Sequence, residues 1–253
     1  NNDKSIRLLY HGTSPTATNA YINSSTMFNS SYNNSMYSGY MYGTSGTLTN
    51  NRTNENSSTI KGVIDTWYQN NLKTNYEKYV SNDAIYCSDR EIGKGTYCPN
   101  CSTTFYYAAY NRMSGANIPT YDCNNNSDKF TVSTSTGNGK LIYPIALMTA
   151  DEIKFAGGLV LNDATSWYYN NSAKTSSTGT NSWWLMTPDE WLDSYSYVYF
   201  VSGSGIPGHL HFAKVDNFKS VRPVISLKSC VKYSSGDGSS SNPYEIKETS
   251  SGC

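Results

Sequence analysis

Charged side chains are scarce in this chain of 253 residues, where Asp, Glu, Lys and Arg together make up 15%, against roughly 25% in an average soluble domain. The 19 basic and 19 acidic residues cancel to a formal net charge of zero. Proteins that bind nucleic acid usually carry a basic stripe, because the phosphate backbone attracts it. The balanced and scattered charges of this chain therefore argue against a nucleic-acid partner.

Long apolar runs are also missing. A membrane-spanning helix needs about 20 apolar residues, whereas residues 143–148 form one of the longest runs. The chain begins with Asn1 and not with Met, so we expect a processed or cut product with any signal or anchor upstream. Clusters of aromatic and aliphatic residues recur from Ile60 onward, which argues against disorder along the whole length. The length then fits one large domain over residues 1–253.

Sequence motifs for catalysis are absent as well. The chain contains no H-E-x-x-H metal motif, no G-x-S-x-G nucleophile elbow and no P-loop. His209 and His211 lie two positions apart on a predicted strand, so their side chains share one face. Two imidazoles placed in this way define an alternative hypothesis, a metal-dependent enzyme. We expect a non-enzymatic protein without a cofactor or a bound metal.

Cysteines are few but even in number: Cys87, Cys98, Cys101, Cys123, Cys230 and Cys253. An even count fits disulfides in an oxidising, extracellular setting. Their spacing predicts the pairs Cys87–Cys123, Cys98–Cys101 and Cys230–Cys253. A zinc site made of the first four thiolates is the alternative, because C-x2-C is a metal-knuckle spacing. A second C-x2-C is lacking, so disulfides are favoured.

Two helices are predicted from local sequence signals. Apolar residues recur at helical spacing from Ile60 to Tyr68, and Ser58 or Thr59 is suited to cap that helix. A second helix begins at Thr149, where T-A-D-E forms a capping box, and ends at Gly157-Gly158. The acids at 151–152 and 189–190 are each assigned to the first turn of a helix, where the dipole stabilises negative charge.

The remaining segments predict short strands and long loops. Residues 1–58 are rich in loops and short strands, such as those expected at 6–10 and 37–42. Strands are further predicted at residues 141–148, 195–201, 209–215 and 221–227. Pro223 lacks an N–H donor, which places the last of these at an edge or a bulge. Short strands with two main helices, not alternating βαβ units, indicate an α+β fold with antiparallel strands.

Aromatic residues are concentrated in the last third of the chain. The densest group is Trp183, Trp184, Trp191, Tyr195, Tyr197 and Tyr199. Aromatic faces beside short polar side chains are suited to holding sugars or irregular protein surfaces. These six residues are therefore the predicted ligand-binding surface.

An ordered series of landmarks spans nearly the whole chain: I-R-L-L-Y-H-G-T-S at 6–14, G-Y-M-Y-G at 39–43, T-I-K-G-V-I-D-T-W-Y at 59–68, Y-P-I-A-L-M-T-A-D-E at 143–152, W-W-L-M-T-P at 183–188, V-R-P-V-I-S-L-K at 221–228, G-D-G at 236–238 and N-P-Y at 242–244. In these landmarks the chain resembles prepilin-type, type IV pilin-like surface proteins of Gram-positive gut bacteria. The resemblance implies an extracellular ectodomain that follows a hydrophobic pilin helix missing upstream. Its C-terminal part, the core of residues 59–253, is similar to C-type-lectin-like folds.

The resemblance implies a function. We expect a cell-surface or filament subunit that contributes to assembly and adhesion through its Tyr/Trp/Asn-rich surface. The expected partners are copies of the chain itself or other pilus subunits, and a host glycan or surface protein. A retroelement-diversified or phage-borne receptor-binding protein with the same C-type-lectin-like fold is one alternative. The metal-dependent enzyme with His209 and His211 as ligands is the other.

Overall fold

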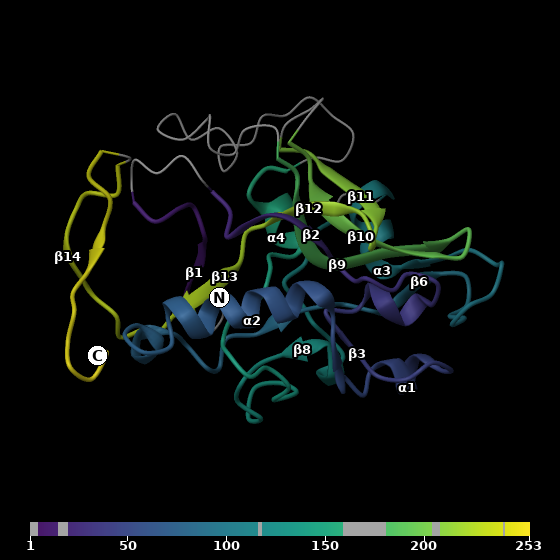
Figure 1. Cartoon of the computed structure of the whole chain (residues 1–253), viewed down its shortest axis with the longest axis horizontal. Helices are drawn as coiled ribbons and strands as arrows, with labels where there is room; N and C mark the ends of the chain where they lie inside the picture. Colours follow the sequence, from purple (N-terminus) through teal and green to yellow (C-terminus); the bar gives the residue numbers. More distant parts are fainter. Residues whose placement is uncertain (1–4, 15–19, 116–117, 159–180, 204–207, 240) are drawn as a thin grey trace.

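The computed structural model describes residues 5–14, 20–115, 118–158, 181–203, 208–239 and 241–253. Helices and short, mainly antiparallel strands form an α+β fold (Figure 1). None of the helices in these ranges is long and apolar enough to cross a membrane.

The main sheet has seven strands and is built around β9. Its strands are β2 (Asn23–Met27), β6 (Ile92–Lys94), β7 (Phe105–Tyr107), β9 (Trp183–Leu192), β10 (Tyr195–Val201), β11 (Leu210–Lys214) and β12 (Phe218–Val221). β9 pairs antiparallel with β10 and β7 and makes one parallel pair with β12. The turn from β9 to β10 contains Asp193 and Ser194, both with positive φ, which suits a tight hairpin.

Four two-stranded sheets surround this one. They pair β1 (Ile6–Leu9) with β13 (Val224–Leu227), β3 (Met41–Tyr42) with β4 (Asn56–Ser57), β5 (Tyr86–Cys87) with β8 (Lys129–Phe130), and β14 (Tyr233–Ser235) with β15 (Glu245–Ile246). The first strand of the chain therefore pairs with one of the last. The β14–β15 hairpin stands away from the body in Figure 1, and we call residues 230–253 the arm.

Both predicted helices are confirmed. They are α2 (Thr59–Asn71) and α4 (Ala150–Phe155). The Ser58 side chain caps α2 by accepting from the Lys61 N–H, and Thr149 forms the expected capping box on α4. Gly157 follows α4 with φ of +94°, a conformation that glycine adopts without strain.

Shorter helical turns complete the fold. They are α1 (Leu48–Asn51), α3 (Ala108–Tyr110), the π-helical turn η3 (Asn111–Gly115) and the 3-10 turns η1 (Ser35–Ser38), η2 (Glu77–Tyr79) and η4 (Asn126–Asp128). The core lies between α2 and the main sheet, where Ile60, Ile64 and Tyr68 pack in one buried cluster with Trp184 and Met186.

Three of the strand predictions need correction. Residues 141–148 are largely buried, but only a single bridge, from Ala146 to Val224, has strand pairing. The segment 37–42 is divided between η1 and β3. The strand expected over 221–227 is interrupted at Pro223, and its two halves join different sheets as β12 and β13. Proline cannot donate to a ladder, so the chain changes sheets there.

A fourth correction concerns Asp189 and Glu190, which lie in the middle of β9 and not in a helix. The preceding Thr187 and Pro188 provide the usual signals of a helix start, a cap and an N1 proline. Long-range pairing overrides them, because Glu190 pairs with Tyr106 of β7 and Pro188 with Val198 of β10.

The six cysteines are joined in the three expected pairs, Cys87–Cys123, Cys98–Cys101 and Cys230–Cys253. None of them is free, so the zinc alternative has no thiolates to use. Chains with several disulfides belong to an oxidising environment. The structure thus supports an extracellular or secreted protein.

A buried ion-pair network holds the polar N-terminal loops onto the body. Arg90 and Asp128 are both fully buried and lie 2.7 Å apart. The guanidinium of Arg90 also donates to the Met41 carbonyl (3.1 Å) and to Asn54 Oδ1 (2.9 Å). Arg52 donates to the other oxygen of Asp128 at 2.9 Å. This network replaces the aliphatic packing that residues 19–58 lack.

Candidate functional site

The predicted aromatic surface is mostly core. Trp183, Trp184, Trp191 and Tyr199 are buried, so their rings are not available to a ligand. The indole N–H of Trp184 donates to the Thr26 carbonyl at 2.8 Å. Three of these four residues lie on β9, a central strand of the main sheet that is buried on both faces.

Two members of that group stay half-buried, Tyr195 and Tyr197. The Tyr195 ring stacks on Tyr32 with centroids 4.8 Å apart, and the Lys214 ammonium lies 3.3 Å from its centre. Tyr197 meets Phe212 edge-on. These rings are engaged by their own neighbours and leave little of the proposed surface.

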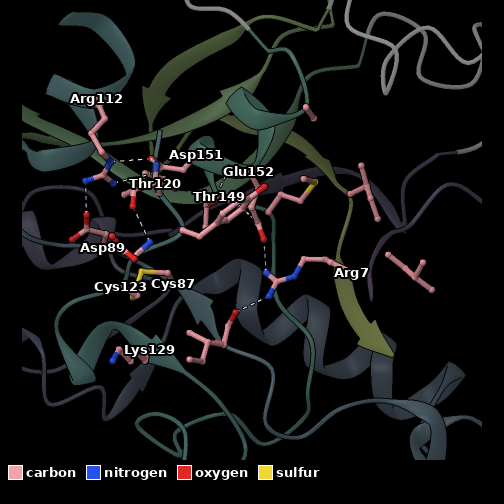
Figure 2. Close-up of a pocket in the computed structure, with 18 of the residues that line it drawn as sticks. Arg7, Cys87, Asp89, Arg112, Thr120, Cys123, Lys129, Thr149, Asp151 and Glu152 are labelled. Carbon is pink, nitrogen blue, oxygen red and sulfur yellow. Dashed lines mark hydrogen bonds and ion pairs between the residues drawn. A yellow bond between two sulfur atoms is a disulfide. The ribbon is translucent and has the colours of Figure 1, made fainter. Parts of the chain in front are cut away.

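A different candidate site lies beside the N-terminal turn of α4. A cleft of about 1100 Å³ is bounded by β1, by the N-terminal turn of α4 and by residues 120–124 (Figure 2). This volume is slightly above the usual range for small-molecule sites, roughly 300–1,000 Å³. The Cys87–Cys123 disulfide lines the cleft and ties the 120–124 segment to β5.

One wall of the cleft is a network of ion pairs around Arg112 that includes Asp151 of α4. Arg112 donates to both oxygens of Asp151, from Nε at 2.9 Å and from a terminal nitrogen at 3.0 Å. Its remaining nitrogen reaches Asp89 at 2.8 Å. The Thr120 N–H also donates to Asp151 (3.0 Å). Bidentate pairs of this kind fix geometry, so the wall is preorganised.

The opposite wall is formed by the next acid along α4. Glu152 accepts from the Arg7 guanidinium of β1 at 2.8 Å and, within the capping box, from the Thr149 N–H at 2.8 Å. Arg7 also donates to the Ile85 carbonyl and lies over the Tyr86 ring at 4.4 Å. Figure 2 shows the two adjacent acids of α4 reaching toward different arginines.

Exposed apolar side chains also line the cleft. Leu8 and Ile85 are partly exposed there. Tyr121 is 66% exposed and stacks on the exposed ring of Phe155 with centroids 4.1 Å apart. Apolar side chains beside a few fixed donors and acceptors are the usual composition of a binding site.

Three acids of the cleft are ion-paired, Asp89 and Asp151 with Arg112 and Glu152 with Arg7. Burial raises the pKa of Asp89, and the Arg112 charge opposes that rise. The pKa of Arg112 is itself raised, because its hydrogen bonds and ion pairs with Asp151 and Asp89 outweigh burial. Mutual neutralisation leaves the cleft suited to a ligand without a large net charge.

The histidines proposed as metal ligands lie on β11 and just before it. His209 is buried, and its ring is 5.7 Å from that of His211. His211 stacks on Phe200. Across the described ranges, no group of three or more His, Cys, Asp or Glu side chains is arranged to hold a metal ion.

The two adjacent acids on β9, Asp189 and Glu190, both have raised pKa values. Burial raises the pKa of Asp189 to about 8, which the nearby Tyr199 hydroxyl offsets only in part. Within the described structure neither oxygen of Asp189 has a hydrogen-bond partner of ordinary geometry. Burial likewise raises the pKa of Glu190 to about 7. Perturbed acids mark functional sites in some proteins, but neither of these two lines the cleft.

Comparison of the chain with protein-family models, with curated proteins and with solved structures finds no match. The pilin-like and lectin-like resemblance therefore stays a prediction. Sequence reasoning also missed the cleft, because its arginines and acids are distant in the chain. One signal in the sequence could have indicated the site, the T-A-D-E capping box at 149–152. Its two acids pair with the two arginines of the cleft, Asp151 with Arg112 and Glu152 with Arg7.

Proposed function

We propose that this protein is a non-enzymatic, extracellular binding module whose ligand occupies the cleft beside α4. The observation that carries the proposal is the preorganised cleft itself. Four of its charged groups form two ion pairs, Arg7 with Glu152 and Arg112 with Asp151, and the exposed Tyr121 lines it as well. Three disulfides suit a protein that works outside the cell.

The finer proposal is a cell-surface or filament subunit, pilin-like in its setting and C-type-lectin-like in its C-terminal part. The α+β architecture and the sequence landmarks at 143–152, 183–188 and 221–228 support it. Adhesion through the cleft replaces the earlier aromatic surface, since four of those six rings are buried. The expected ligands are a host glycan, a host surface protein or another subunit.

Binding to immobilised glycans and extracellular-matrix proteins tests the proposal. We expect Tyr121→Ala to weaken binding about tenfold, because loss of one exposed aromatic contact costs on the order of 1–2 kcal/mol. Tyr76→Ala is the matched control, since Tyr76 is also an exposed tyrosine but does not line the cleft. Equal binding by both variants and the unmodified protein would contradict the cleft as the adhesion site.

A further inference from the structure

β1 has one paired edge and one free edge. In β13, Val224 exchanges hydrogen bonds with Ala146, and the Ser226 carbonyl accepts from Ser81. The N–H and C=O groups of successive residues in a strand point to opposite sides. Ile225 and Leu227 therefore turn toward β1, where they pair with Leu8 and Ile6.

The same alternation turns the N–H and C=O groups of Arg7 and Leu9 away from β13. Among the described residues, no backbone or side-chain hydrogen bond reaches these four groups. β1 thus presents an unpaired edge, and an edge of this kind is a template for another strand.

The cleft runs along this free edge. Consecutive side chains of a strand point to opposite faces, yet Arg7, Leu8 and Leu9 all line the cleft. A cavity that touches all three follows the edge and not one face. Neighbouring strands of a sheet lie about 4.8 Å apart, and the cleft leaves open space of about 1100 Å³ beside this edge.

The arm carries the complementary feature. The Lys247 N–H donates to the Lys232 carbonyl, so the backbone groups of the next pair, Tyr233 and Ile246, point outward from the hairpin. Both side chains are exposed, Tyr233 at 64%, and Tyr244 beside them is 59% exposed. A two-stranded hairpin by itself is marginally stable in water, so this apolar surface favours a covering partner.

The base of the arm is firmly held while its strands project. The Cys230–Cys253 disulfide closes it, and the Tyr79 hydroxyl accepts from the Thr249 N–H at 2.7 Å. Figure 1 shows the hairpin clear of the main sheet and of α2. One chain therefore displays both an acceptor edge and a protruding strand pair.

We propose that the free edge of β1 accepts a strand of the arm from a second copy of this chain, so that the cleft is a self-assembly site. This rests on the proposed function and specifies the ligand of the same cleft. Main-chain groups of Tyr233 or Ile246 pair with those of Arg7 and Leu9, and the apolar side chains of the arm cover Leu8. A reciprocal exchange closes a pair of subunits, whereas a one-way exchange extends into a chain.

The test is self-association of the full chain by light scattering and analytical ultracentrifugation between about 5 and 500 μM. Leu9→Pro removes the outward N–H, and an edge strand tolerates proline at such a position. Leu9→Ala is its control, with a similar loss of side chain but an intact N–H. We expect association by the unmodified chain and by Leu9→Ala, and a weakening of about tenfold in Leu9→Pro, the effect of one lost hydrogen bond with steric exclusion added.

The arm has its own variant, Ile246→Lys, because a charge on an edge strand blocks pairing. It is expected to weaken association as much as Leu9→Pro does, with an unchanged unfolding midpoint. A chain that stays monomeric up to 500 μM overturns the proposal, as does association that neither variant affects. Loss with Leu9→Pro alone overturns the arm as the occupant. Glycan binding that depends on Tyr121 in a monomeric chain would leave the proposed function intact while this inference fails.

Discussion

Two aspartates of this protein are equally buried but differ in their hydrogen-bond and ion-pair partners. Asp128, under the N-terminal loops, is 1% exposed and accepts from Arg90 and Arg52 at 2.7–3.1 Å. Asp189, on the central strand β9, is 0% exposed and has no hydrogen-bond partner of ordinary geometry in the described structure. In one region arginines pair with the buried carboxylate, whereas in the other burial raises the pKa of the carboxyl group.

The difference follows from how each region is held in place. The loops around residues 41–54 have few aliphatic residues to bury, so the Arg90–Asp128 pair and its hydrogen bonds to backbone carbonyls hold them in place. β9 is already fixed by pairing on both sides. The Asp189 side chain is not needed for that pairing, and burial disfavours its charged form.

The largest expected effect is at the satisfied site. Asp128→Ala leaves two arginines without their buried partner, and breaking a buried pair costs about 3–5 kcal/mol. Urea unfolding followed by tryptophan fluorescence measures the loss. Glu91→Ala is the control, because Glu91 also pairs with Arg52 but is substantially exposed, and such pairs contribute under about 1 kcal/mol. Equal losses in the two variants would remove the distinction between the sites.

Asp189→Asn should stabilise the folded protein, whereas Asp128→Ala should destabilise it. The folded-state pKa of Asp189, about 8, exceeds the unfolded value of about 3.9. The folded form therefore holds a proton that the unfolded form releases, and stability falls as pH rises from about 4 to 8. The amide removes this decline, so we expect a gain of a few kcal/mol at pH 8 and little change at pH 4. A variant that is less stable than the unmodified chain at pH 8 would argue for a structural or catalytic role of the carboxylate.

Glu190→Gln sharpens the same comparison with a smaller effect. Its pKa of about 7 is also raised by burial and by the nearby Asp193 charge. Stability should again fall with rising pH, here up to about pH 7, and the glutamine variant should flatten that part of the curve. Unfolding midpoints at pH 4, 6 and 8 measure it. A decline that persists unchanged in a chain with both amides would assign the pH dependence to other groups.

The smallest effect is expected at an exposed acid, Asp237 in the tip of the arm. Its oxygen accepts from the Ser239 N–H at 2.9 Å, and backbone hydrogen bonds lower its pKa. Asp237→Asn keeps that acceptor, so the global unfolding midpoint should not move. Hydrogen exchange of residues 233–246 reports the local change. A shift in the midpoint would show that the arm and the body unfold as one unit.

Part of this fold could be predicted from neighbouring residues alone. α2 and α4 follow from apolar spacing and from the caps at Ser58 and Thr149, which act within one or two turns. The cysteine spacing led to the three pairs that the structure joins. Pro223 predicted an edge or a bulge within one strand, whereas the chain changes sheets there.

The cleft and the burial of the aromatic group depend on contacts between distant parts of the chain, which local sequence patterns do not show. T-P-D-E at 187–190 satisfies every local rule for a helix start, and pairing with β7 and β10 made it strand. Six clustered aromatic residues indicated a surface, but their position on central strands buried four of them. Arg7 and Glu152 are 145 positions apart, so no spacing rule links them.

The sequence by itself determined the extracellular chemistry, the two capped helices and the cysteine partners, because these depend on composition or on contacts made within a short stretch. Only the tertiary structure decided which buried aspartate meets an arginine and which has its pKa raised by burial. It also decided that the edge of β1 remains open beside a cleft. Such outcomes depend on which backbone groups and charges are brought together across the whole chain, and a linear pattern does not contain that information.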